Sequence, residues 1–168
     1  MEVAICEICL KRGILCPGCE KRLKNGEITQ LDVEIAKLLH SLTSTFRGLR
    51  NLRLKRSIEA GGMVILVTDP RDVGTLIGKG GKIVKILSER LDKKVRVVGD
   101  SKDKLVIARD LISPARVLGV NVLYPPNGKE RYKVRVSKKE ASRLPSDDST
   151  LEKILGELTG KDIIISLE

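Results

Sequence analysis

The sequence predicts an α+β protein made of two copies of one helix-strand-strand-helix-helix-strand unit, preceded by a small four-cysteine segment. Apolar residues recur at helical spacing in some segments and in short β-branched runs in others. The element order of the first half of the chain returns in the second half. All four cysteines lie within residues 6–19. We therefore expect three parts: a zinc knuckle at residues 1–26, a first unit at residues 27–99 and a second unit at residues 100–168.

The size and composition of the chain exclude several classes of protein. Its 168 residues suffice for one ordinary domain or two small ones, and 41% hydrophobic residues are enough to build a core. The longest apolar run covers only residues 63–67, whereas a membrane span needs roughly 18 apolar residues. Because the start lacks a basic segment followed by an apolar one, we expect a cytoplasmic protein with no membrane partner.

The charge of the chain points to a partner that carries phosphates. Lys and Arg number 32 against 22 Asp and Glu, so the formal net charge is +10, which is typical of nucleic-acid-binding proteins. Residues 27–99 contain 14 basic and 8 acidic side chains and so carry +6 of this charge. Phe46, Tyr124 and Tyr132 are the only aromatic residues. Any nucleic acid must therefore be held without rows of stacking rings.

The elements of both units follow from periodicity and turn signals. Thr29 is a candidate cap for the first helix, and Gly61 with Gly62 forms a candidate turn between strands. In the first unit we expect helices at residues 28–47, 69–77 and 82–91, and strands on either side of the turn and at residues 95–98. In the second unit we expect helices at residues 102–112, 138–144 and 150–158, and strands at residues 115–124, 131–136 and 163–165.

A loop with three glycines separates two helices of the first unit. Gly78, Gly80 and Gly81 carry no Cβ, so the backbone can come close to a phosphodiester chain. The helix that begins near Lys82 aims its free amides at the same place, and lysines 79, 82 and 85 add positive charge. The spacing fits neither the P-loop nor the dinucleotide-binding pattern. A plain turn between helices is the alternative, which the surrounding element order disfavours.

The stretch LIGKGGKIVKIL at residues 76–87 resembles the core of a KH domain, and the element order resembles the type II arrangement of that fold. Two such units, joined near residues 99–101, are similar to the tandem KH domains of archaeal NusA-like proteins. The resemblance covers residues 27–168. It implies a single-stranded RNA ligand whose backbone crosses the glycine loop while about four bases lie in an aliphatic groove. The implied RNA-binding residues are Ile77, Gly78, Lys79, Gly80, Gly81, Lys82, Val84, Lys85 and Val97.

The second unit departs from this pattern at the matching loop. A shift of 68 residues places the glycine loop on residues 146–149, whose sequence is Ser-Asp-Asp-Ser. Asp147 and Asp148 would repel phosphates, and no glycine opens the backbone there. We therefore assign no RNA contact to this loop and expect a structural or protein-contacting role for the second unit.

The four cysteines form two Cys-x-x-Cys pairs, which suit a tetrahedral metal ion. Cys6, Cys9, Cys16 and Cys19 would offer four soft ligands and leave no open position, so we expect one structural Zn²⁺. The six-residue gap between the pairs is shorter than the usual spacing of about 15–20 residues. Rubredoxin-like iron and an iron–sulfur cluster are alternatives, and a redox dithiol lacks the expected strand-helix context. Basic residues near the cysteines leave three roles open for this segment. It contacts nucleic acid, it docks on another protein, or the metal ion merely orders the terminus.

The sequence favours a binding protein over an enzyme. His40 is the only histidine and lies in an amphipathic helical run, so no triad based on histidine has a second candidate. The resemblance implies a factor in transcription elongation or termination that contacts RNA polymerase or another part of the transcription machinery. The alternatives are a protein-interaction adaptor and a ribosome or RNA-processing factor. Arg50, Arg53, Lys55 and Arg56 either extend the RNA footprint or form a solvated face.

Overall fold

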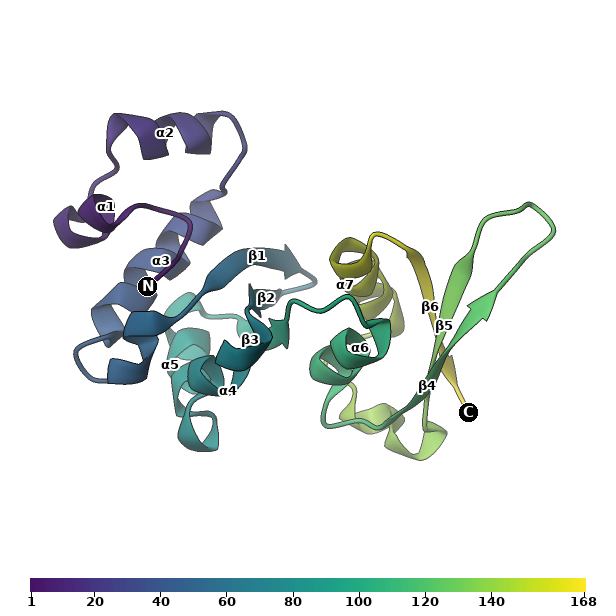
Figure 1. The fold of residues 1–168 in the computed structure, drawn as a ribbon. Helices are drawn as coiled ribbons and strands as arrows, with labels where there is room; N and C mark the ends of the chain where they lie inside the picture. Colours follow the sequence, from purple (N-terminus) through teal and green to yellow (C-terminus); the bar gives the residue numbers. More distant parts are fainter.

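The computed structural model describes residues 1–168 as an elongated α+β molecule with two three-stranded sheets (Figure 1). The α-helices are α1 (Glu7–Arg12), α2 (Pro17–Lys24), α3 (Gln30–Leu42), α4 (Val73–Ile77), α5 (Lys82–Leu91), α6 (Lys104–Ile112) and α7 (Asp148–Thr159). Short 3-10 helices are η1 (Arg47–Asn51), η2 (Pro70–Asp72), η3 (Lys79–Gly81) and η4 (Lys138–Arg143). The strands are β1 (Leu54–Ala60), β2 (Met63–Thr68), β3 (Lys94–Gly99), β4 (Val117–Leu123), β5 (Arg131–Val136) and β6 (Asp162–Leu167). None of the helices combines the length and the apolar character that crossing a membrane requires.

The two sheets have the same topology. In each, the first two strands are antiparallel and the last runs parallel to the middle one, giving the orders β1-β2-β3 and β4-β5-β6. The expected element order is present in both halves, with three differences. The predicted helix at residues 69–77 consists of the 3-10 helix η2 followed by the short helix α4. The first helix ends at Leu42 instead of continuing to Arg47, because three hydroxyl residues, which favour turns over helix interiors, follow it. The predicted helix at residues 138–144 is the 3-10 helix η4.

The helices of the first unit cover one face of its sheet. Thr29 caps α3 in a reciprocal capping box with Asp32, as the sequence predicts. Val64 and Leu66 point from β2 into a core with residues of α3, α4 and α5. Successive side chains of a strand alternate between faces, so their neighbours Ile65 and Val67 must be buried on the other side.

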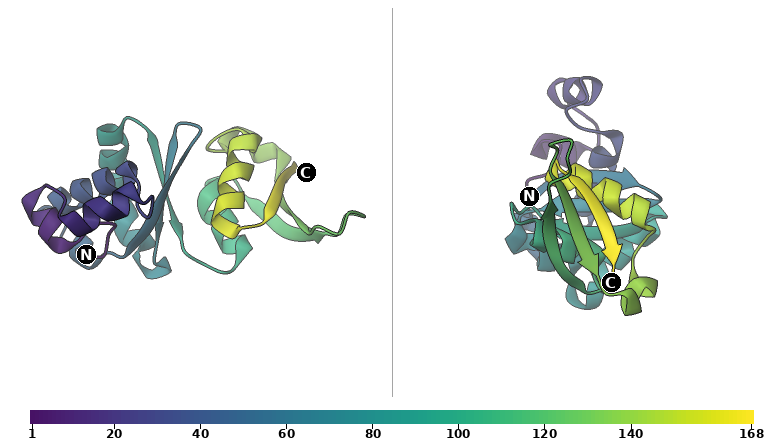
Figure 2. Two further views of the ribbon diagram at one scale, coloured as in Figure 1. Left: turned by 90° about the horizontal axis from the view of Figure 1, so that it is seen from above. Right: turned by 90° about the vertical axis from the view of Figure 1, so that its right-hand side faces the viewer.

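That other face packs against the helices of the second unit. The largest core cluster contains 18 buried residues and joins both sheets to α6 and α7, which lie between them (Figures 1 and 2). Its members from the first sheet are Ile58, Ala60, Met63, Ile65, Val67 and Val98. Its members from α6 and α7 include Leu111, Ile112, Leu151, Ile154 and Leu155. One continuous apolar core therefore unites the two units, and the segment at residues 99–101 is not a free linker.

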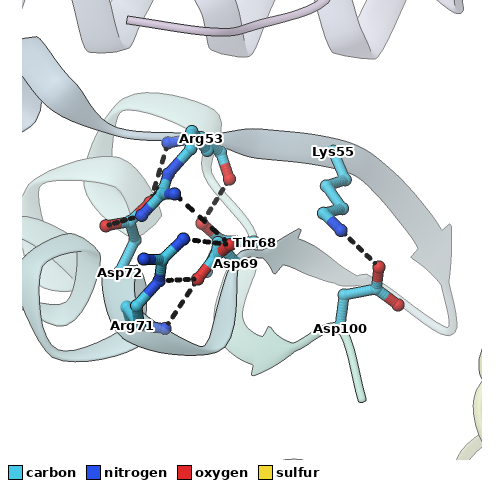
Figure 3. A network of polar contacts seen from close by, with 7 residues as sticks. All are labelled: Arg53, Lys55, Thr68, Asp69, Arg71, Asp72 and Asp100. Atoms are coloured by element: carbon cyan, nitrogen blue, oxygen red, sulfur yellow. Dashed lines mark hydrogen bonds and ion pairs between the residues drawn. The ribbon is translucent and has the colours of Figure 1, made fainter. Parts of the chain in front are cut away.

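A polar network fixes the start of α4 against β1 (Figure 3). The Asp72 carboxylate accepts hydrogen bonds from the Arg53 amide (3.0 Å) and Nε (3.1 Å), and Thr68 Oγ1 donates to the Arg53 carbonyl (2.7 Å). Asp69 accepts from the side chain and amide of Arg71, which lowers the pKa of its carboxyl to about 2. Because the glycine loop follows α4 directly, this network also positions that loop.

The same region contains the contacts of three basic residues at the start of β1. Lys55 Nζ lies 2.8 Å from Asp100 Oδ2, which raises the lysine pKa (Figure 3). Arg53 pairs with Asp72, and Arg56 donates to the carbonyl of Glu157 on α7. Arg53 is partly buried by its contacts, whereas Lys55 and Arg56 are exposed and make their contacts at the surface of the protein.

The cysteine-rich segment packs on α3 through a small core of its own. Helices α1 and α2 bury Cys9, Leu10 and Cys19 against residues of α3 such as Val33. The chain before α1 runs beside the first sheet, where Glu2 pairs with residues 52 and 54 through backbone hydrogen bonds of 2.8 and 2.9 Å. The segment is therefore attached to the first unit at two places.

Removing part of the shared core should destabilise both units together. Ile65 of β2 is fully buried where the first sheet packs against the helices of the second unit. Ile65→Ala should therefore lower the free energy of unfolding by about 2–5 kcal/mol. A urea titration followed by circular dichroism should show one transition at a lower midpoint. Ile164→Ala, a matched change outside this cluster, should cost much less. Two separate transitions would contradict a shared core.

Candidate nucleic-acid interface and metal centre

The glycine loop adopts a conformation that requires glycine for two different reasons. Gly78, Gly80 and Gly81 have φ values of 80°, 64° and 76°, a region that other residues rarely adopt. A Cβ on Gly78 would lie 2.8 Å from Ile83 Cγ1 and 3.0 Å from the backbone nitrogen of that residue, so this glycine serves packing. A Cβ on Gly80 or Gly81 would meet nothing within 4 Å. These two glycines keep the outer surface of the loop open to a ligand.

Positive charge surrounds the open side of the loop. Lys79, Lys82 and Lys85 are exposed and take part in none of the ion pairs of the protein. The ten-residue helix α5 begins here without a side-chain cap, so the positive end of its dipole adds to the charge of the lysines. Phe46 lies beside the loop, with its ring centre 5.9 Å from Lys82 Nζ. The loop thus presents uncompensated charge to solvent.

A groove of about 330 Å³ opens next to the loop, along the free edge of β3. Of the predicted residues, Ile77, Gly81, Val84 and Val97 line it. The other predicted residues, Gly78, Lys79, Gly80, Lys82 and Lys85, belong to the loop and the first turn of α5 beside it. Val73 and Val95 complete the apolar wall and were not predicted. Alternation along β3 and the helical spacing from Ile77 were signals that could have identified them.

The second wall of the groove comes from the second unit and was missed by sequence reasoning. Arg109 and Asp110 of α6 and Ser113 just after it line the groove, together with Arg96 of β3. The Arg96 guanidinium donates to the carbonyls of Asp110 and Ser113 and so fastens the end of α6 to β3. Burial lowers the pKa of this guanidinium. No periodicity within either unit signals this contact.

The acidic loop of the second unit has a structural role. Asp147 caps α7 by accepting from the Thr150 amide (3.0 Å) and hydroxyl (2.7 Å), and these bonds lower its pKa. Thr150 lies against Gly61, where a Cβ would approach its Cγ2 to 2.5 Å. Lys94 Nζ also donates to the Pro145 carbonyl at 2.9 Å. The loop that matches the glycine loop is therefore a helix cap docked on the first unit.

The four cysteine sulfurs converge on one point, all within 4.8 Å of one another. Cys6 Sγ lies 3.4 Å from Cys9 Sγ and 3.9 Å from Cys16 Sγ. Tetrahedral ligands at a Zn–S distance of about 2.3 Å would be about 3.8 Å apart, so the spacing suits a metal ion of this size. The sequence prediction that these four residues come together is confirmed, and they can bind a metal ion.

Backbone amides donate to the sulfurs, as expected where thiolates are stabilised. The Cys16 amide donates to Cys9 Sγ at 3.0 Å, and the Cys19 amide to Cys16 Sγ at 3.4 Å. The latter bond lowers the pKa of Cys16 to about 7. At Cys9 the Cys16 amide also lowers the pKa, but burial and the neighbouring thiols outweigh it and raise the value to about 12. A cation at the centre would therefore have to displace a proton from Cys9.

Comparison with known proteins agrees with the geometry of the loop and groove. Residues 46–100 match the model of the NusA-like first KH domain, so the middle of the chain contains a KH domain of the NusA-like kind, which supports an RNA-binding role. The crystal structure of APE1850 is 24% identical, covers 83% of this chain and 100% of its own, and has a TM-score of 0.59; this likeness shows a shared fold. No curated protein matches the chain.

Metal binding at the cysteines should depend on pH with a definite sign. Protons compete with the metal for the thiolates, above all at Cys9, so affinity should fall as the pH decreases from about 8 to 6. Calorimetry of the reduced protein with Zn²⁺ should give one ion per chain and proton release. Cys19→Ser should lose this binding. Failure of the reduced protein to bind one Zn²⁺, or an affinity independent of pH, would contradict the assignment.

Proposed function

We propose that the protein binds single-stranded RNA at the groove beside the glycine loop. The observation that carries the proposal is the combination of an open glycine backbone, three lysines without acidic partners and an adjacent apolar groove. The match of the same residues to the NusA-like first KH domain supports it. In this binding mode the RNA backbone crosses Gly80 and Gly81, and the bases lie against Ile77, Val84 and Val97.

The groove accounts for RNA binding by a chain with three aromatic residues. In a groove of the KH type, aliphatic side chains pack against the faces of the bases, so no aromatic stacking is needed. Contacts of the phosphates with the lysines and the helix end supply most of the affinity. The role that this supports best is that of a NusA-like factor in transcription elongation or termination. In that role the protein acts in the cytoplasm without catalysis, and RNA polymerase or another transcription component is its partner. The second unit would be a second, degenerate KH module.

A second function, that of a protein-interaction adaptor, has one observation in its favour. Ile8 and Ile14 in the cysteine-rich segment are 61% and 64% exposed, and Lys11 and Arg12 lie between them in the sequence. Exposed apolar residues in a segment held by a structural Zn²⁺ suit a docking surface better than an RNA contact. In this alternative the cysteine-rich segment binds a partner protein that acts in transcription, in ribosome function or in RNA processing.

Blocking the open side of the loop should abolish RNA binding without unfolding the protein. In the double variant Lys79→Glu with Gly80→Asp, a carboxylate pair replaces the charge and clearance that phosphates need. We expect at least a hundredfold loss of affinity for a single-stranded RNA octamer, measured by fluorescence anisotropy. Gly128→Asp is the matched control, because Gly128 has φ 78° and equally open space but lies in the β4-β5 hairpin. Unchanged affinity in the double variant would refute the proposed site.

Binding should also weaken as salt concentration rises. We assume that the three lysines and the helix end contact about three phosphates. A plot of the logarithm of the affinity against the logarithm of the salt concentration should then have a slope of about −2 for single-stranded RNA. Lys82→Ala should reduce the magnitude of this slope, and Lys129→Ala in the hairpin should leave it unchanged. A flat salt response would show that phosphates do not dominate at this site.

A further inference from the structure

The polar side chains of the RNA groove come from one side only. Six lining residues are glycine, valine or isoleucine of the first unit, whose side chains contact the faces of bases but offer no hydrogen-bonding group to base edges. The remaining four are Arg96, Arg109, Asp110 and Ser113, and all belong to α6, follow it directly or bind its end. Hydrogen bonds from side chains to base edges therefore come from these four residues, three of which belong to the second unit, and backbone groups at the free edge of β3 are the other source.

Asp110 and Arg109 both line the groove and have hydrogen-bonding capacity that the protein does not use. Arg96 is engaged by the carbonyls of Asp110 and Ser113. Asp110 accepts from the Gly99 amide through Oδ2 (3.1 Å), which fixes the orientation of its carboxylate. Its Oδ1 takes part in none of the hydrogen bonds of the structure, and neither does the exposed guanidinium of Arg109. A free acceptor on Asp110 and a free donor on Arg109 thus line the same groove.

We propose that Asp110 and Arg109 read base edges in this groove and favour a base that presents an amino group beside a ring nitrogen, cytosine or adenine, over uracil. This inference rests on the proposed RNA-binding function. A carboxylate oxygen only accepts hydrogen bonds, so it pairs with the N4 amino group of cytosine or the N6 amino group of adenine. Arg109 only donates and pairs with the neighbouring ring nitrogen. Uracil presents O4 in place of the amino group, and this carbonyl oxygen is repelled by the carboxylate.

The proposal gives α6 a function that the glycine loop does not have. Contacts to the backbone hold any sequence, whereas contacts to base edges distinguish them. Arg96 fastens the end of α6 to β3, and the Gly99 amide holds the Asp110 carboxylate. This acceptor is therefore in place before RNA binds, which lowers the ordering cost of recognition. The second unit then contributes to recognition although its own loop is a helix cap.

The test compares base preference with overall affinity. The probes are uridine octamers and versions with one cytosine or one adenine placed at each position in turn, measured by anisotropy at fixed salt. We expect the unsubstituted protein to bind at least one substituted octamer about fivefold to tenfold more tightly than the all-uridine octamer, the size of effect that one good base contact gives. Asp110→Asn should shift this ratio at least fivefold toward uridine, because Asn keeps the acceptor for Gly99 and places an amino donor where Oδ1 was. Arg109→Ala should lower the affinity for the preferred octamer severalfold.

Matched controls separate this proposal from the proposed function. Asp103→Asn removes the same charge from the start of α6, where Asp103 is the helix cap outside the groove, and should leave the ratio unchanged. Arg90→Ala on the last turn of α5 serves the same purpose for Arg109. An unchanged ratio in Asp110→Asn overturns the proposal while RNA binding that depends on Gly80 still stands. Absence of binding by the unsubstituted protein to every octamer overturns both.

Discussion

The packing of the first sheet against α6 and α7 is the contact on which the rest of the structure depends. Ile65 and Val67 of β2 lie on one side of this contact, and Leu111 and Ile154 on the other. The first sheet is thereby buried on both faces, which explains why β2 is buried along its whole length and apolar from Met63 to Val67. The contact also brings the end of α6 to the edge of β3, so the groove beside the glycine loop acquires its second wall.

This packing explains why the two units, whose sheets have the same topology, differ in their loops. In the first unit the loop faces solvent, and glycine at positions 80 and 81 leaves it open. In the second unit the equivalent loop lies against the turn at Gly61 and accepts a hydrogen bond from Lys94. A loop in that position has no surface for a phosphate backbone, and a capping aspartate at position 147 stabilises α7 there. Because this loop is docked on the first unit, it has no need of glycines that would keep it open to a ligand.

Local features were predictable from the sequence, and contacts between units were not. Thr29 as a helix cap, the helix from Lys82 and the convergence of four cysteines depend on spacing within about fifteen residues, and sequence patterns report such spacing directly. The roles of Arg53 and Lys55 were left open, since their acidic partners Asp72 and Asp100 come from distant segments. Periodicity shows which side chains are buried but not which element buries them. For this reason the sequence identified Ile77, Val84 and Val97 in the groove and missed Arg109 and Asp110.

The central claim is that single-stranded RNA lies in the groove between the glycine loop and α6. Its most direct test is an NMR titration of the isotope-labelled protein with a single-stranded RNA octamer, in which each backbone amide reports its own surroundings. We expect the largest shifts at residues 77–85, at residues 95–97 along β3 and at residues 109–113 of the second unit. Shifts confined to the cysteine-rich segment or to the open face of the second sheet, with residues 77–85 unperturbed, would contradict it.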